Sequence, residues 1–321
     1  MPSSASSPVC SHRSRPLGRR QVLGIFSATG ALLVIGCPDG GDEPTGTTGT
    51  TGAGTGATAT TGTGTSTGKT TSESATGDGT TGAIECGDIA TAWAVGGTAA
   101  MTAQDCYPDP FAGGVLSCAL ICETTAGPCT TETTADRQDV SEGFGGLPVR
   151  LALLIVDADS CAPVAGARVE IWHTQRTGVY SGVTPSPKQC YVDDPGAAAF
   201  NYFRGQRTSG PDGRVDFDTC FPGWYGGRAI HIHFRVTRDG QVYATSQLFF
   251  TDPLAVEIFA AHPEYSEFGP PNTTNISDGV IGGQADKTHY LLDTARMPDG
   301  AMLASKVIAV RSSLQDPTCS V

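Results

Sequence analysis

The feature that most limits the fold is a tract of low complexity between Pro38 and Glu85. Of its 48 residues 17 are Thr and 13 are Gly, and none is aromatic. Such a composition buries too little apolar surface to offset the entropy lost on ordering, so we expect a flexible tether. A Gly-rich coil of this length spans about 40 Å. The fold must therefore come from Cys86 to Val321, a stretch whose length suits one all-β domain.

The residues before this tract resemble an export signal. Arg19 and Arg20 precede an apolar run from Val22 to Ile35, which is too short to span a bilayer of about 30 Å. The run ends in LVIGC, similar to the cleavage site of bacterial lipoproteins, so Cys37 is expected to be an acylated anchor. An ordinary signal peptide followed by an incidental Cys is the alternative.

These patterns predict three parts of the chain. Residues 1–36 are expected to be a twin-arginine lipoprotein signal, residues 37–85 a lipid-anchored linker, and residues 86–321 the folded domain. The protein would then be exported and held at the periplasmic or cell-surface face of a membrane, with the lipid as its only membrane contact. Its oligomeric state is left open.

Charge and cysteine usage limit the partners and the compartment. The chain has 20 Lys and Arg against 32 Asp and Glu, a net charge of −12, so nucleic acid is not an expected partner. Nine Cys lie between Cys86 and Val321, which allows at most four disulfides and leaves one thiol. Zinc binding is the competing use, but the chain has no CxxC pair. Disulfides in an oxidising compartment are therefore favoured, with their connectivity open.

Short segments rich in β-branched residues dominate the folded part. Asp239-Gly240 between two of them is a strong hairpin signal, and Asp252–Ala261, with an early Pro, is the clear helix. Strands without alternating helices indicate an all-β, antiparallel β-sandwich with few short helices. The predicted strands are Val149–Asp157, Ala167–His173, Arg214–Thr219, Ile230–Val236, Gln241–Phe250 and Lys306–Arg311.

Two histidines share one face of a predicted strand. Side chains alternate along a strand, so His231 and His233 project together while the residues between and after them face the core. A solvated polar face is the alternative. Tyr225 lies in a Gly-flanked turn before the strand, and Tyr180 in the segment GVYS is the candidate for a second phenol. Two imidazoles and two phenols suit Fe(III) better than zinc, because a phenol bound to a ferric ion becomes a phenolate.

The order VEIWH, GVY, PGWY, HIHF and TSQLFF resembles the intradiol ring-cleaving dioxygenases, the family of catechol 1,2-dioxygenase and protocatechuate 3,4-dioxygenase. The resemblance covers roughly Cys118 to Val321 and implies that family's β-sandwich core. It implies that Tyr180, Tyr225, His231 and His233 hold Fe(III), with Tyr225 axial and released when substrate binds, His233 opposite it, and Tyr180 and His231 equatorial. Arg228 and Gln247 match the family's active-site Arg and its substrate-side Gln.

The resemblance further implies an activity. Both atoms of O2 would be inserted into a small catechol-type aromatic diol to give a muconate-type diacid, with Tyr225 as general base, Arg228 stabilising anionic character and Gln247 bonding the developing oxyanion. Two departures concern the substrate. Ala126 and Cys129 replace an acid and an aromatic of the family's TxEGPFY-like motif, and only two residues separate Tyr225 from Arg228.

Other functions remain open at this point. The segment Leu154–Val169 also resembles transthyretin-like β-sandwich modules that serve as inactive surface binding modules, although such a module does not need the four candidate ligands. A protein that binds a metal without turnover is the third possibility. His173 is expected to pack and hydrogen-bond locally, His262 to lie on the surface, and Tyr265 is a candidate for the mouth of the site.

Overall fold

The structure, a computed structural model, describes residues 86–115, 117–132 and 134–320. The signal, Cys37 and the Thr/Gly-rich linker lie outside these residues, so what the sequence indicates for them stays a prediction. None of the helices in the described part of the chain has the length and apolarity needed to cross a bilayer.

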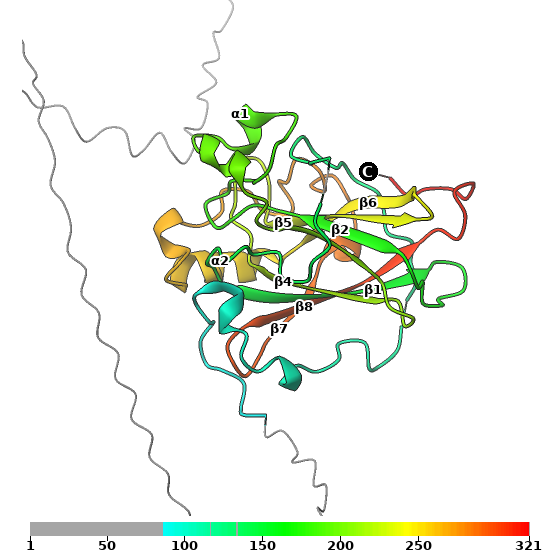
Figure 1. Ribbon diagram of the computed structural model, residues 1–321, viewed down its shortest axis with the longest axis horizontal. Helices are drawn as coiled ribbons and strands as arrows, with labels where there is room; N and C mark the ends of the chain where they lie inside the picture. The colour runs from blue at the N-terminus through cyan, green and yellow to red at the C-terminus, as the bar shows by residue number, and fades with distance from the viewer. Residues whose placement is uncertain (1–85, 116, 133, 321) are drawn as a thin grey trace, which may run out of the picture. The chain divides into compact units, whose positions relative to one another are not determined.

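Two four-stranded sheets pack face to face, with strand orders β4-β1-β8-β7 and β3-β2-β5-β6 (Figure 1). Residues from both sheets, such as Leu153, Phe217 and Phe234, form the main core between them. The expected all-β sandwich with few short helices is confirmed. The strands are β1 (Pro148–Asp157), β2 (Arg168–Trp172), β3 (Arg204–Thr208), β4 (Arg214–Cys220), β5 (His231–Arg238), β6 (Gln241–Phe249), β7 (Asp293–Arg296) and β8 (Met302–Val310).

One strand pairing departs from the expected antiparallel arrangement. β1 runs parallel to β8, with Val149 opposite Met302 and Asp157 opposite Val310, whereas the other paired strands are antiparallel. The predicted antiparallel sandwich therefore has one parallel pair of strands. β1 and β8 are far apart in the chain, and strands of both sheets lie between them. No tight turn joins the two strands, so no turn sequence indicates whether they run parallel or antiparallel.

Two strands were not predicted, and both lie at sheet edges. β3 has the sequence RGQRT and β7 has DTAR, and neither shows apolar alternation. Edge strands in natural sheets often carry charged residues, which discourage pairing with other chains. Their sequences therefore resemble loops more than strands.

The apolar run of β1 is buried on both faces. On the side away from the core, Ala152 packs with Tyr107 and Phe111, and Leu154 and Val156 pack with Phe111 and Val115. Figure 1 shows this N-terminal segment running below the sheet. Because both faces of β1 are buried, its sequence is a continuous hydrophobic run and does not alternate between apolar and polar residues.

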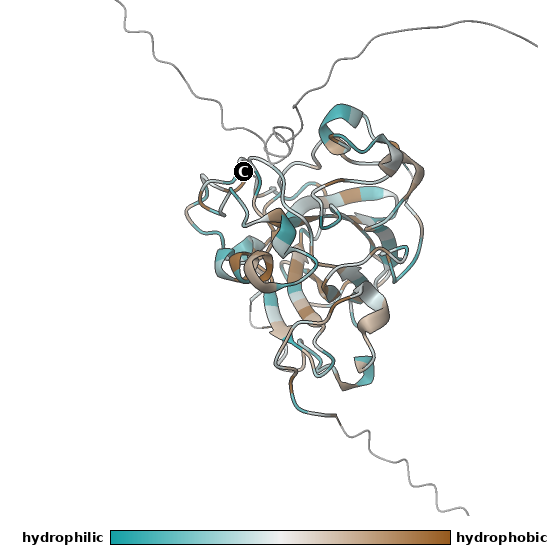
Figure 2. Cartoon of the chain, turned by 90° about the vertical axis from the view of Figure 1, so that its left-hand side faces the viewer, coloured by the Kyte–Doolittle hydropathy of each residue, from teal (hydrophilic) through white to brown (hydrophobic). Residues whose placement is uncertain are grey.

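The helical elements are short. α2 (Asp252–Ala261) has the predicted bounds, with Pro in its first turn, and it buries Ala255, Ile258 and Phe259 at one end of the sandwich. Figure 2, viewed from this end, shows hydrophobic and hydrophilic residues mixed along the helices and strands. The other elements are α1 (Pro187–Cys190) and the 3₁₀ helices η1 (Gly97–Ala100), η2 (Gln104–Cys106), η3 (Pro195–Ala199), η4 (Ser266–Phe268) and η5 (Thr288–Tyr290).

Eight of the nine cysteines in the described chain form disulfides. The pairs are Cys86–Cys106, Cys118–Cys161, Cys122–Cys319 and Cys129–Cys190. The ninth, Cys220, is a buried free thiol. The expectation of at most four disulfides and one free cysteine is confirmed. The structure also gives the connectivity of the four disulfides, which the sequence had left open.

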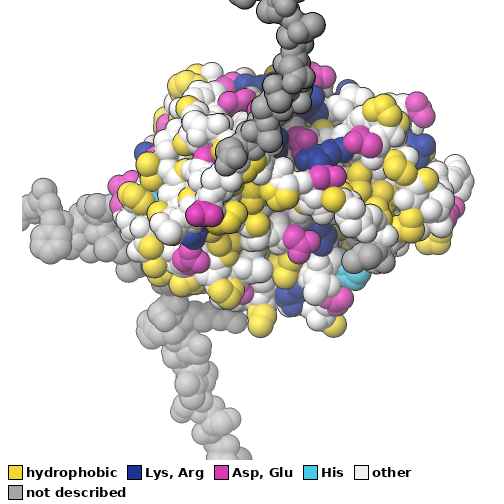
Figure 3. Space-filling model, turned by 90° about the horizontal axis from the view of Figure 1, so that it is seen from below, with side chains coloured by type: hydrophobic (Ala, Val, Ile, Leu, Met, Phe, Trp, Pro, Cys, Tyr) yellow, Lys and Arg dark blue, Asp and Glu magenta, His cyan; other side chains and the backbone are white. Residues whose placement is uncertain are grey.

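The surface carries both signs of charge. Seen from below in Figure 3, acidic and basic side chains are interspersed among hydrophobic ones. Oppositely charged side chains also pair in the described chain, such as Arg150 with Asp218 and Arg214 with Asp109. This face of the described chain therefore presents no large field of one sign.

Candidate metal centre

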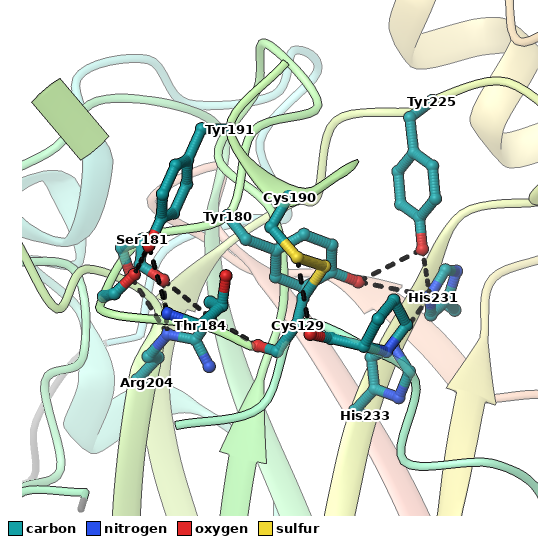
Figure 4. The surroundings of a disulfide bond; sticks show 12 residues. Cys129, Tyr180, Ser181, Thr184, Cys190, Tyr191, Arg204, Tyr225, His231 and His233 are labelled. Atoms are coloured by element: carbon teal, nitrogen blue, oxygen red, sulfur yellow. Dashed lines mark hydrogen bonds between the residues drawn. A yellow bond between two sulfur atoms is a disulfide. The ribbon is translucent and has the colours of Figure 1, made fainter. Parts of the chain in front are cut away.

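Four polar atoms converge on the outer face of the β3-β2-β5-β6 sheet, the face away from the core (Figure 4). The Tyr180 and Tyr225 hydroxyl oxygens are 3.3 Å apart. Nε2 of His231 lies 3.4 Å from the Tyr180 hydroxyl, 3.2 Å from the Tyr225 hydroxyl and 3.2 Å from Nε2 of His233. The structure thus brings together the four residues that the sequence predicted as ligands.

The two histidines are placed by the alternation of β5. Ile232 and Phe234 are fully buried in the core between the sheets, so His231 and His233 project from the opposite face. Burial of the apolar residues therefore fixes the direction of both imidazoles.

A glycine brings the two tyrosines together. Gly178 has a φ of +80°, and a Cβ at this position would collide with the main-chain oxygen of Trp224. Only glycine allows the segment before Tyr180 to approach the turn before Tyr225 this closely. The amide of Tyr180 also donates to the carbonyl of Cys190 at 3.0 Å, which fixes the segment from its other side.

The His231 tautomer follows from its hydrogen bond. Nδ1 lies 2.7 Å from the carbonyl oxygen of Ala229, so it carries the proton and donates it. The lone pair on Nε2 of His231 is then directed at the point where the four side chains meet. The chain thus presents a free ligand atom there rather than a proton.

Burial keeps these groups uncharged. It lowers the pKa of His231 to about 3 and that of His233 well below its usual value. Burial also raises the pKa of Tyr180 well above its usual value, with a further contribution from Tyr225, and raises that of Tyr225 despite the opposing charge of Arg228. Two neutral imidazoles and two neutral phenols therefore face one another, and a cation between them would favour the phenolates.

The donor set fits an iron ion. Four of the six separations among the donor atoms are 3.2 to 3.4 Å, close to the spacing of ligand atoms around one metal ion at metal–ligand distances of about 2.0 to 2.2 Å. Imidazole and tyrosinate both occur as iron ligands in proteins. No group of three His, Cys, Asp or Glu side chains in the described residues could hold a metal, so the phenols are needed to complete this one.

Arg228 and Gln247 lie beside the four donors and contact each other. Nη2 of Arg228 donates to Oε1 of Gln247, and Nε2 of Gln247 donates to the carbonyl of Thr125 at 2.8 Å. Nε of Arg228 donates to Asp278 at 3.0 Å, and the side chain of Asp278 is fully buried. The amide oxygen and the amide nitrogen of Gln247 thus both form hydrogen bonds within the chain. The bond to its oxygen orients Arg228.

Asp278 was missed by sequence reasoning, although among the described residues it is the one carboxylate paired with Arg228. Burial would raise the pKa of Asp278, but the charge of Arg228 and hydrogen bonds from the amides of Ala229, Val280 and Ile281 together lower it. The Asp sits in a loop 50 positions after Arg228. No local pattern in the sequence links it to the site.

A cavity of about 340 Å³ opens onto these groups, within the range of small-molecule sites. Tyr225 is partly exposed in it, whereas Tyr180, His231 and His233 are each at most 3% exposed. The lining residues are Gly127, Pro128, Cys129, Gly178, Tyr180, Gln189, Val192, Tyr225, Gly226, Arg228 and His233.

Three other candidates are resolved by the structure. His173 is buried and bonds the carbonyl of Thr174 and the hydroxyl of Thr219, which confirms local packing. His262 is buried rather than at the surface, because it ends α2 and contacts the carbonyl of Ala94. Tyr265 does not line the cavity: it is buried in the core and donates to the carbonyl of Phe221.

The chain is similar to known ring-cleaving enzymes, although no family model matches it. It is 32% identical over 143 residues to catechol 1,2-dioxygenase 1 of Acinetobacter lwoffii, which covers 39% of this chain and 43% of that protein. It is 25% identical over 143 residues to chlorocatechol 1,2-dioxygenase of Pseudomonas putida, which covers 39% of this chain and 50% of that protein. The chain thus spans half or less of these two curated relatives.

A solved structure matches more of the fold. The intradiol ring-cleavage dioxygenase from Tetranychus urticae superposes with a TM-score of 0.54 at 28% identity. The match covers 63% of this chain and 99% of that one. The similarity therefore extends over nearly the whole length of the solved chain.

Proposed function

We propose that the chain, which is similar to the intradiol ring-cleavage dioxygenases, is a non-haem Fe(III) enzyme. It inserts both atoms of O2 into a catechol-type diol and releases a muconate-type diacid. The relatives' names support the substrate class, since two of them are a catechol and a chlorocatechol 1,2-dioxygenase.

The observation that carries the proposal is the convergence of two phenols and two imidazoles. The polar atoms of Tyr180, Tyr225 and His231 lie 3.2 to 3.4 Å from one another, and Nε2 of His233 lies 3.2 Å from Nε2 of His231. Tyr180, Tyr225, His231 and His233 would hold the iron. When bound, Fe(III) would supply the Lewis acidity that makes the phenols phenolates and withdraws electron density from a diol, so that the ring becomes open to O2.

Tyr225 is proposed as the base that accepts one of the two diol protons. Of the four candidate ligands it alone is partly exposed, and the two glycines that follow it are exposed. Its ring is therefore the one with room to move when a diol enters the cavity. Tyr180 is buried and tied to Cys190 through its main chain, so it is proposed to stay in place.

Arg228 is proposed to stabilise negative charge on the bound diol. Its guanidinium reaches the cavity and keeps a fixed direction, because Asp278 and Gln247 hold two of its nitrogen atoms. A donor that is already oriented costs no reorganisation when charge develops. Gln247 acts through Arg228 in this proposal and not by direct contact with the developing oxyanion.

Export on a lipid anchor at Cys37 remains part of the proposal. Four disulfides in the described domain support an oxidising compartment, where such bonds persist. A diol substrate would then reach the enzyme outside the cytoplasm.

Iron loading followed by oxygen uptake tests the function. The full chain is loaded with iron, its metal content and visible absorption are measured, and O2 consumption is recorded with catechol, hydroxyquinol and protocatechuate. The proposal expects a red-brown protein that consumes O2 with at least one of these diols. A colourless, iron-free protein would favour the inactive transthyretin-like module, and a coloured protein without O2 uptake would favour metal binding alone.

A further inference from the structure

The Cys129–Cys190 disulfide lies in the wall of the catalytic cavity (Figure 4). Cys129 lines the cavity, and both cysteines belong to the same buried apolar cluster as Tyr180. The other three disulfides contribute no residue to the described lining of the cavity. The Cys129–Cys190 bond therefore differs from the other three disulfides in lying beside the cavity.

On one side, the bond holds the loop that covers His233. Gly127 lies so close to this imidazole that a Cβ would be 3.2 Å from Cε1 of His233. None of the described strands makes a backbone–backbone hydrogen bond to residues 126–130. The sheet therefore does not fix this loop, and its position depends on other contacts.

On the other side, the bond reaches the segment that carries the second phenol. Cys190 ends α1, and its carbonyl oxygen accepts the 3.0 Å hydrogen bond from the amide of Tyr180. Its neighbours Gln189 and Val192 also line the cavity. The disulfide thus joins the loop next to His233 to the segment next to Tyr180.

A buried arginine, Arg204, also bridges the same two segments through hydrogen bonds. Nη2 of Arg204 donates to the carbonyls of Cys129 and Ser181, at 2.7 Å each. Arg204 is 2% exposed, and burial lowers its pKa to about 10. Without the disulfide, these hydrogen bonds would still link the two segments, but no covalent bond would.

We propose that the Cys129–Cys190 disulfide is a positioning element of the proposed dioxygenase site, an inference that rests on the function proposed above. It keeps the Gly127 loop against His233 and sets the width of the cavity between that loop and Tyr180. Cys129 and Cys190 act through these two candidate ligands and do not contact the reacting atoms.

Two matched pairs of substitutions test the proposal in the full, iron-loaded chain. Cys129→Ser/Cys190→Ser removes the bond at the cavity. Cys118→Ser/Cys161→Ser removes a bond of comparable loop length, with sequence separations of 61 and 43 residues respectively. The two losses should change the entropy of the unfolded chain to a similar extent, because that cost rises only slowly with loop length.

The readouts are the phenolate-to-iron absorption band, kcat and KM for catechol, and hydrogen exchange of residues 126–130. The cavity variant should shift the band, raise KM by about ten- to a hundredfold and speed exchange in this loop. The control should lower the melting temperature and leave all three unchanged. Equal behaviour of the two variants would overturn the inference.

A second variant covers the case in which the cavity pair does not fold. Gly127→Ala keeps the disulfide and forces the loop away from His233, so it should shift the band and raise KM in the same direction. An unchanged band and KM in Gly127→Ala would contradict the inference. A wild-type chain that takes up no iron would contradict the proposed function instead, and the exchange measurement would then still decide whether the bond holds the loop.

Discussion

The imidazole of His233 stacks on the indole of Trp172, with ring centroids 5.0 Å apart and planes 7° apart. The two residues are direct neighbours across β2 and β5. Nδ1 of His233 is buried and has no hydrogen-bond partner among the described residues, whereas Nδ1 of His231 donates to a carbonyl. The two candidate ligands are thus oriented by different means, His233 by ring stacking and His231 by a hydrogen bond.

Trp172→Leu should therefore weaken iron binding by about tenfold, because groups that orient metal ligands affect affinity on this scale. The loss of ring volume should also cost about 2 to 4 kcal/mol of unfolding free energy. Chelator competition and urea unfolding measure the two effects. Trp93→Leu, which removes an indole that contacts Arg296 and Glu257, is the control and should affect stability alone. Unchanged iron affinity in Trp172→Leu would show that the stack does not orient His233.

The two phenols should respond differently to the loss of their hydroxyl groups. Tyr180→Phe removes a buried, fixed ligand and should lose most of the bound iron. Tyr225→Phe should keep iron with an altered absorption band and lose turnover by about 10²- to 10⁴-fold, the usual contribution of a general base. Iron content and steady-state kinetics check both variants, with Tyr243→Phe on β6 as the control. Full turnover in Tyr225→Phe would remove the base role.

Asp278→Asn should lower activity without releasing iron. The change removes the carboxylate that pairs with Arg228, and breaking a buried ion pair costs about 3 to 5 kcal/mol. Urea unfolding, iron content and kcat/KM for catechol measure the result. Glu257→Gln removes the partner of Arg296 at the surface and should cost at most about 1 kcal/mol. An unchanged kcat/KM in Asp278→Asn would mean that the ion pair with Asp278 is not needed to orient Arg228 for catalysis.

His173 should make the fold sensitive to acid. Burial lowers its pKa to about 3 from a usual 6.5, so the folded protein stays unprotonated at this ring while the unfolded chain takes up a proton. Stability from this group is present above pH 6.5 and is lost as pH falls toward 3, with a slope of about 1.4 kcal/mol per pH unit.

His173→Gln should flatten this dependence by about that slope, as measured by urea unfolding across the acid range. His289→Gln is the matched control, since His289 is only partly buried and lies 3.5 Å from Asp286. If both variants show the wild-type slope, His173 does not titrate as described.

Local periodicity made much of the fold and site predictable. The alternation in β5 set His231 and His233 on one face, and the Pro in the first turn marked the start of α2. These signals depend only on neighbours in the chain. The joint pattern of Tyr180, Tyr225 and the histidine pair then pointed to a shared centre that the structure forms.

Long-range features could not be predicted in the same way. The parallel direction of β8, the pairing of Cys129 with Cys190 and the ion pair between Asp278 and Arg228 each join segments without a local signature. Likewise, burial of Tyr265 follows from packing in three dimensions.

Isotope labelling of the product tests the central claim most directly. The iron-loaded chain is incubated with catechol under ¹⁸O2, and the product is analysed by mass spectrometry. The account predicts a muconate-type diacid that contains both labelled oxygen atoms. A quinone, or a product without label, would contradict ring cleavage by O2 insertion at this site.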